Sequence, residues 1–150
     1  MALQEKLQQD LKDAMRSGDT ARRDVIRFIR ARIHDQEIER RASLDDDRII
    51  DVLGQQAKQR QESIDAFKKG DRPDLVAKEE AELGIIREYL PAQLSEDEIA
   101  QIVRAAIDET GAAVPQDMGK VMGLVMPQVR GKADGRTVSR MVQELLKSAD

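Results

Sequence analysis

The chain has 150 residues and a net charge of −4; 40% of its residues are apolar and 36% are charged. It contains no cysteine, which excludes disulfides, thiolate metal sites and a cysteine nucleophile. With one tyrosine, two phenylalanines and no tryptophan, the core must be built from aliphatic side chains, and such cores are typical of packed helices. The negative net charge gives no global attraction for nucleic acid, so any such binding must come from local patches.

The N-terminal part is predicted to form about four long helices. Apolar residues recur at helical spacing, as in the stripe Leu3, Leu7, Leu11 and Met15. Ser43 and Asp46 form an approximate capping box for the third helix, and Pro91 is expected to stop the fourth. The expected helices cover residues 2–17, 20–41, 43–69 and 73–89.

After Pro91 the helices become shorter and glycine and proline become frequent, which indicates a domain boundary near residues 90–95. A clean capping box of Ser95 and Glu98 begins the first of three further helices. These are expected over residues 95–110, 116–126 and 135–147, with Pro127 ending the second. The sequence therefore predicts an all-α fold, with a helical domain over 1–90 and a small three-helix module over 91–150.

The sequence contains no pattern typical of a catalytic centre. His34 is the only histidine, and its acidic neighbours on the same helix are too few and too poorly spaced to predict a metal site. Asp45, Asp46 and Asp47 lie in the first turn of a helix, where the dipole stabilises negative charge, and we interpret this as their whole role. We expect no catalytic residue, no metal and no cofactor.

The segment 131–136 opens the last helix and is the nearest approach to an anion-binding loop. Free amides at this helix start, with Lys132 and Arg136 beside them, could bind a phosphate. Alternatively, Asp134 itself caps these amides, and Gly131 and Gly135 only permit the turn.

Charge is segregated in the C-terminal part. Residues 118–147 contain six basic and two acidic side chains, a net charge of +4, whereas residues 95–117 contain one basic and six acidic side chains, a net charge of −5. The candidate phosphate contacts are Lys120, Arg130, Lys132, Arg136 and Arg140. A second basic strip, Arg23, Arg27, Arg30 and His34, is interpreted as a solvated helix face. The near absence of aromatic residues argues against recognition of single strands by base stacking.

Methionines at 118, 122 and 126 form a stripe at helical spacing. We interpret the stripe as core filler, with a flexible partner-binding groove as the alternative. With no long apolar run and no signal-peptide pattern at the start, we expect a cytoplasmic protein.

Several stretches together resemble one family. They are 88–95 (EYLPAQLS), 117–123 (DMGKVMG) and 131–135 (GKADG), with 25–27, 37–38 and 78–83 upstream. The set closely resembles the YqeY family over essentially the full length. Val114-Pro115 is a local departure just before the sixth helix. The YqeY family resembles the tail of GatB, a subunit of the glutamine-dependent amidotransferase that acts on misacylated tRNA.

The resemblance implies a tRNA-binding or tRNA-associated accessory protein, because the GatB tail engages the tRNA body. The family's label of carbon–nitrogen ligase with glutamine as amido donor belongs to a catalytic domain that has no counterpart in these residues. The alternative is an adaptor that docks on an amidotransferase or aminoacyl-tRNA synthetase complex through its N-terminal helices. An amide-forming enzyme is disfavoured, since no glutaminase nucleophile or ATP site is visible.

Overall fold

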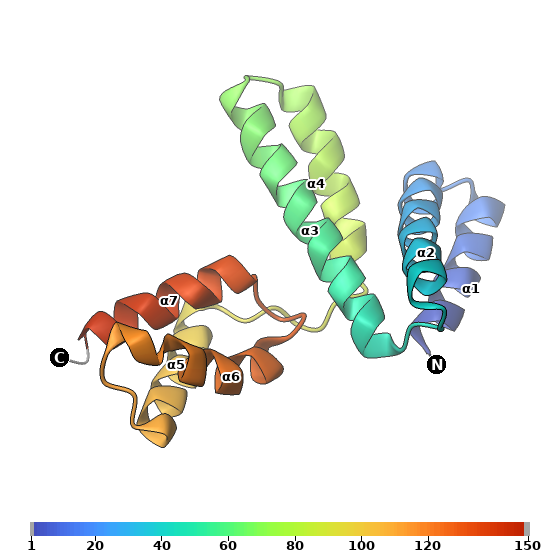
Figure 1. Ribbon diagram of the computed structural model, residues 1–150. Coiled ribbons are helices and arrows are strands. Elements are labelled where there is room, and N and C mark those ends of the chain that lie inside the picture. Colours follow the sequence, from blue (N-terminus) through green and yellow to red (C-terminus); the bar gives the residue numbers. More distant parts are fainter. Residues whose placement is uncertain (1, 149–150) are drawn as a thin grey trace. The chain divides into compact units, whose positions relative to one another are not determined.

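The computed structural model describes residues 2–148 (Figure 1). The prediction of an all-α fold is confirmed, because the described residues form seven α-helices and one short 3-10 turn without any strand. The helices are α1 (Leu3–Ser17), α2 (Thr20–Arg40), α3 (Asp46–Lys69), α4 (Pro73–Arg87), α5 (Glu96–Thr110), α6 (Met118–Val129) and α7 (Gly135–Ser148), with the turn η1 (Pro115–Asp117) before α6.

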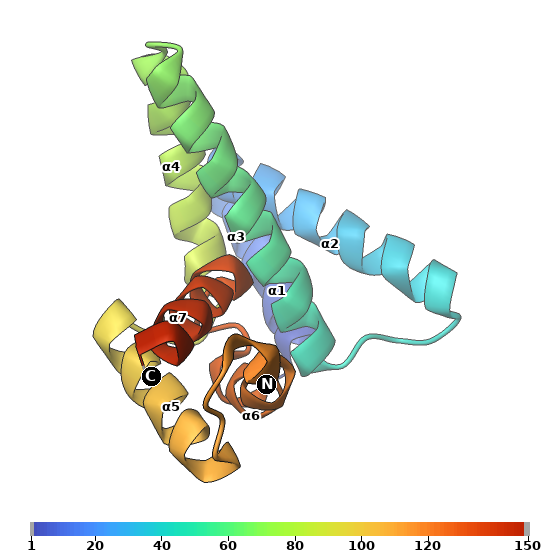
Figure 2. The same cartoon turned by 60° about the vertical axis from the view of Figure 1, so that its left-hand side comes forward.

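The chain divides into two compact units, residues 1–91 and 92–150. The N-terminal unit contains α1 to α4, and in both views α3 and α4 lie side by side as a hairpin (Figures 1 and 2). The C-terminal unit contains α5, α6 and α7, which gather into one small bundle (Figure 2). Each unit has a core of its own.

The N-terminal core collects the apolar stripes of α1 and α2 against the base of the α3–α4 hairpin. It contains Leu7, Leu11, Val25, Ile26, Ile29, Ile33, Leu44, Ile49, Val52, Leu53, Ile86 and Tyr89. Gly18 ends α1 with a left-handed φ of 77°, a conformation that glycine adopts without strain. The Asp19 side chain accepts a hydrogen bond from the Arg22 backbone amide at 3.1 Å and thereby caps the start of α2.

The third helix begins later than the capping box that we expected at Ser43. Its N-cap is Asp45, whose carboxylate accepts a hydrogen bond from the Arg48 amide at 2.9 Å. Leu44 is buried, and its backbone amide donates to the Glu37 carboxylate at 3.0 Å. Because these contacts hold the chain at Leu44 outside the helix, α3 can begin only after it.

Asp46 has a second role that its position in a helix start did not indicate. The backbone amide of Leu3 donates to Asp46 Oδ1 at 3.0 Å. Ala2, the N-cap residue of α1, supplies no side-chain cap, so a carboxylate from α3 satisfies an otherwise unpaired amide of α1. Our interpretation of the three aspartates as purely local was therefore wrong for Asp46.

The fourth helix ends at Arg87, two residues before the expected end at Tyr89. The amides of Glu88, Tyr89 and Leu90 donate to carbonyls three residues back, at 3.2, 3.1 and 3.2 Å. This tighter turn places the Tyr89 ring in the core, where its side chain is buried.

In the C-terminal unit the capping box of α5 is confirmed. Ser95 Oγ accepts from the Glu98 amide, and Glu98 Oε1 accepts from the Ser95 amide, both at 3.1 Å. The core of this unit is Ile99, Ala100, Val103, Ala106, Ile107, Ala112, Val121, Val125, Val129, Val138, Met141, Val142 and Leu146.

The sixth helix differs from expectation at both ends. It is preceded by η1, where Asp117 Oδ2 accepts from the amide of Ala113 at 3.1 Å. It continues past Pro127 to Val129, because Val125 and Val129 are both fully buried and hold the helical path on either side of the proline. The prediction that Pro127 ends this helix was wrong.

The methionine stripe lies beside the core instead of forming it. Valines at positions 121, 125 and 129 provide the buried row of α6, while Met118 and Met122 are partly buried against its edge. The Met126 side chain is 38% exposed, which contradicts its expected inward position. Within residues 2–148, no helix combines the length and apolar composition that a membrane span requires.

Candidate functional site

The loop between α6 and α7 is held in place by backbone hydrogen bonds. Gly131 adopts a left-handed φ of 73°, and the amides of Lys132 and Ala133 donate to the Val129 carbonyl at 2.8 and 3.1 Å. The Leu94 amide donates to the Lys132 carbonyl at 2.9 Å. The start of α7 is thereby fixed against the segment that precedes α5.

Asp134 takes part in closing the start of α7. Its Oδ1 accepts from the Arg136 amide at 3.1 Å, and its carbonyl accepts from the Val138 amide at 3.1 Å. Of the two alternatives for this segment, the geometry favours the one in which Asp134 satisfies an amide of the helix start. A phosphate here would have to compete with that carboxylate.

The five candidate cations are all exposed, but they differ in their acidic neighbours. Lys120 Nζ lies 4.0 Å from Asp117 Oδ1. Arg130 and Arg136 both have interaction partners within the chain. Lys132 has no ion pair with any residue between 2 and 148.

Arg140 is the most strongly engaged of the five. Its guanidinium lies 3.2 Å from Glu144 Oε1 on the next turn of α7 and 2.8 Å from Glu96 Oε1 on the first turn of α5. The hydrogen bond that Arg140 donates to Glu144, together with the charges of both acids, raises the pKa of Arg140 above its ordinary value. Because of these two acids, the positive potential around Arg140 is lower than the number of basic residues in the sequence suggested.

Arg136 and Arg140 nevertheless share one face of α7, because residues four apart lie one helical turn apart. That face is opposite Val138 and Val142, which are fully buried in the core of the unit. Lys132 lies in the loop that leads into the same helix. The structure therefore presents Arg136 and Arg140 outward in a row, with partner acids beside Arg140.

No metal-binding cluster of three or more histidine or acidic side chains occurs in the range 2–148. Glu37, on the same helix as His34, is committed elsewhere: it accepts from the Leu44 amide at 3.0 Å and from Gln4 Nε2 at 3.1 Å. The hydrogen bond from Leu44, followed by that from Gln4, lowers the pKa of Glu37. Glu37 therefore helps to join α1 and α2 to the loop before α3.

Two hollows that the sequence did not predict lie beside α2, where the basic strip that we interpreted as solvated borders both of them. One, of about 300 Å³, lies beside Arg30 and His34, and the other, of about 130 Å³, lies beside Arg23 and Arg27. We call the two hollows together the groove between α1 and α2. The spacing of the strip was visible in the sequence. Its position beside α1 was not.

Curated relatives of this chain share one name, Altered inheritance of mitochondria protein 41, mitochondrial. The relative from Pyrenophora tritici-repentis is 34% identical over 94% of this chain and 79% of its own length. That from Eremothecium gossypii is 38% identical over 73% of this chain and 63% of its own length. That from Kluyveromyces lactis is 34% identical over 81% of this chain and 70% of its own length.

These relatives contradict one expectation from the sequence. We expected a cytoplasmic protein, but the relatives are named as mitochondrial proteins. The absence of a long apolar run and of a signal-peptide pattern carried no information on this point, so the cytoplasmic prediction was wrong.

The match to a family extends over nearly the whole chain and both structural units. A sequence model of the family described as Yqey-like protein matches residues 4–146, from the first turn of α1 to the last turns of α7. The chain belongs to the YqeY-like protein family.

Proposed function

We propose that this chain is an accessory binding protein for tRNA that has no catalytic centre of its own and acts beside a glutamine-dependent amidotransferase. The resemblance of its family to the GatB tail supports this function. The observation that carries it is the outward row of Arg136 and Arg140 on α7, with Lys132 in the loop that leads into the helix. The planar guanidinium of arginine can donate two hydrogen bonds to the oxygens of one phosphate. Contacts of this kind position a protein on nucleic acid without reading the base sequence.

The acids beside Arg140 do not prevent this role. The side chains of Arg140, Glu96 and Glu144 are 49%, 69% and 61% exposed. Ion pairs at such exposure contribute little to stability, so a phosphate can replace a carboxylate as the partner of Arg140. The exchange reduces the net free energy gained from the Arg140 contact, and Lys132, which has no ion pair with any residue between 2 and 148, is expected to contribute more.

Salt dependence measures the number of phosphate contacts. If about four phosphates are neutralised, log affinity falls with log salt at a slope of roughly −3 to −4. Because Glu96 and Glu144 offset part of the charge, we expect the shallow end of that range.

Filter binding of the full chain to total tRNA tests the proposal. The double charge reversal of Lys132→Glu with Arg136→Glu is expected to weaken binding at least tenfold and to flatten the salt slope. A matched control reverses two exposed lysines of the N-terminal unit, Lys69→Glu with Lys78→Glu. The proposal fails if micromolar protein shows no saturable, salt-sensitive binding, or if both double variants weaken binding equally.

A second candidate function is an adaptor that docks on an amidotransferase or synthetase complex. The groove between α1 and α2 favours it, since both hollows are formed by residues of the N-terminal unit, whereas the basic face of α7 belongs to the C-terminal unit. Recovery of such a complex with the full chain after nuclease treatment would support the adaptor. Loss of every partner protein after nuclease treatment would count against it.

A further inference from the structure

The groove between α1 and α2 has a hollow near each end. The hollow near the α1–α2 turn is lined by Ala14, Met15, Gly18, Thr20, Arg23 and Arg27. The hollow near the other end of α2 is lined by Gln4, Arg30, Ala31, Ile33, His34 and Glu37. Both sets come from α1, α2 and the turn between them, and the two hollows together are what we call the groove.

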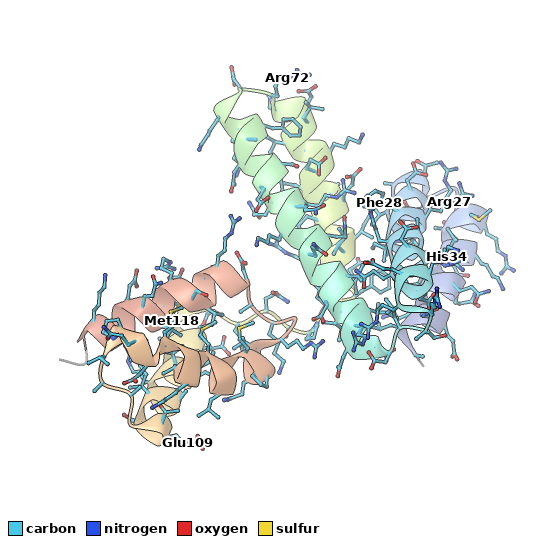
Figure 3. The ribbon with its side chains drawn as sticks, viewed as in Figure 1. Arg27, Phe28, His34, Arg72, Glu109 and Met118 are labelled. Carbon is cyan, nitrogen blue, oxygen red and sulfur yellow. The ribbon has the colours of Figure 1, made fainter. Side chains whose placement is uncertain are left out.

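Four basic side chains, which we call the groove strip, border this groove. They are Arg23, Arg27, Arg30 and His34. Their spacing of four, three and four residues keeps them on one face of α2, over a length of about 16 Å at 1.5 Å per residue. Figure 3 shows Arg27 and His34 on one side of α2 and Phe28 on the other.

Two other arginines of α2, Arg22 and Arg32, make contacts within the unit. Arg22 makes a bidentate ion pair with Glu88, in which Nη1 lies 2.5 Å from Oε2 and Nη2 lies 3.2 Å from Oε1. Arg32 lies 5.0 Å from the ring centre of Phe28 and 3.8 Å from Asp35. These contacts indicate that Arg22 and Arg32 serve the packing of the N-terminal unit.

The groove strip is different, because its central members have no acidic partner. Within residues 2–148, neither Arg27 nor Arg30 has an ion pair, and the Arg27 guanidinium donates a hydrogen bond to the sulfur of Met15 at 3.9 Å. Arg23 is paired with Asp24 at 2.9 Å. The single acid among the residues lining the two hollows is Glu37, which already accepts two hydrogen bonds. The positive charges of Arg27 and Arg30 are thus left without an acidic partner beside the groove, with Arg23 and His34 on either side of them.

The groove also offers apolar contacts. The Met15 side chain is 54% exposed at one hollow, and Ala31 is exposed at the other. Methionine adapts its shape readily and is favoured at surfaces that bind helices. No aromatic side chain lines either hollow, so the groove lacks the stacking platform that single-stranded nucleic acid uses.

We propose that this groove binds an acidic amphipathic helix of a partner protein. Carboxylates repeating at four, three and four residues on that helix would face the groove strip, and its neighbouring apolar side chains would enter the two hollows. Helices bind in this way through anchors one turn apart. This inference deepens the adaptor function and is independent of tRNA binding by α7.

The probe for this proposal is a fluorescein-labelled peptide helix with glutamates at that spacing and leucines on the adjoining face. Its control has the same composition with the glutamates distributed around the helix. We expect saturable anisotropy binding of the first peptide to the full chain, at least tenfold tighter than the control. Equal binding of both peptides, or no binding of either, overturns the proposal.

Charge-reversal variants then test where on the chain the peptide binds. Arg27→Glu with Arg30→Glu is expected to weaken peptide binding at least tenfold, and Arg27→Gln with Arg30→Gln to weaken it by less. Lys69→Glu with Lys78→Glu and the α7 pair Lys132→Glu with Arg136→Glu should each change it less than twofold. If every reversal weakens binding equally, the attraction is nonspecific and the proposal fails.

His34 provides a reporter at the site, because it is the only histidine in the sequence. Its imidazole proton resonances and the Met15 methyl resonance are expected to shift with the same dissociation constant as the peptide anisotropy. If tRNA shifts the His34 resonances and the peptide does not, the groove belongs to nucleic acid and the helix proposal is overturned. Failure of tRNA binding at α7 leaves this result unaffected, so the two proposals fail separately.

Discussion

The Tyr89 hydroxyl donates a 2.5 Å hydrogen bond to the Asp10 carboxylate, across 79 residues of sequence. It joins the turn that follows α4 to the middle of α1. Burial of the tyrosine, followed by its hydrogen bond to Asp10, raises the pKa of Tyr89 above its ordinary value, so the hydroxyl remains a donor throughout the neutral range.

Replacing Tyr89 by phenylalanine should destabilise the N-terminal unit. The Tyr89 side chain is buried, and its loss as a donor leaves the Asp10 carboxylate with one partner fewer. We expect the free energy of unfolding to fall by about 1 to 3 kcal/mol, measured by urea denaturation. Asp10→Asn is the control: its amide oxygen still accepts from Tyr89, so it should cost less. A smaller loss for Tyr89→Phe than for Asp10→Asn would contradict this role.

The neighbouring ion pair of Arg22 and Glu88 predicts a pH dependence. The hydrogen bond from Arg22 lowers the pKa of Glu88 below its ordinary value of 4.5. The ionised form is therefore favoured in the folded state, so the stabilisation is complete above pH 4.5 and is lost as the pH falls through the lowered pKa.

Glu88→Gln should remove this contribution. Because the side chain is 54% exposed, we expect a loss of at most about 1 kcal/mol at pH 7. The difference between the urea midpoints of the variant and the original chain should shrink as the pH falls below 4.5. A difference that persists unchanged at pH 3 would show that the ionised pair is not its source.

The helices were predictable because their signals are local. The capping box of Ser95 and Glu98 and the apolar stripes of α1 and α2 follow from spacing within a few residues. The start of α3 was not predictable in this way, since burial of Leu44 depends on the whole N-terminal core. The Asp46 cap on the Leu3 amide likewise requires knowledge of two helices far apart in sequence.

The candidate sites show the same limit. Each of the five cations on α6, α7 and their connecting loop could be named from the sequence, but the acid that faces Arg140 from α5 lies 44 residues away. The spacing of the groove strip was visible, whereas its place beside a groove depends on how α1 packs on α2. Sequence patterns identified charged faces; packing decides which of them remain open.

Pro127 predicts a stabilising substitution. It lies inside α6, where it cannot donate a hydrogen bond to the preceding turn. Pro127→Ala should raise the free energy of unfolding of the C-terminal unit by about 1 to 3 kcal/mol. Pro73→Ala is the matched control, because Pro73 occupies the first position of α4, where no donor is needed. A loss of stability in Pro127→Ala equal to that of the control would refute this account.

The two separate cores predict two separate unfolding events. Ile29 and Ile99 are buried in the N-terminal and C-terminal cores, at 0% and 2% exposure. Truncation of either to alanine leaves a cavity and should cost about 2 to 5 kcal/mol in its own unit.

The aromatic residues allow the two events to be observed in the full chain. The single tyrosine is Tyr89, which lies in the N-terminal unit. Its fluorescence therefore follows that unit alone, whereas far-ultraviolet circular dichroism follows the helices of both. Ile29→Ala should shift the tyrosine transition to lower urea, and Ile99→Ala should shift only a part of the dichroism transition. If Ile99→Ala moves the Tyr89 fluorescence transition as far as Ile29→Ala does, the units unfold as one, and the proposal of two independent domains is wrong.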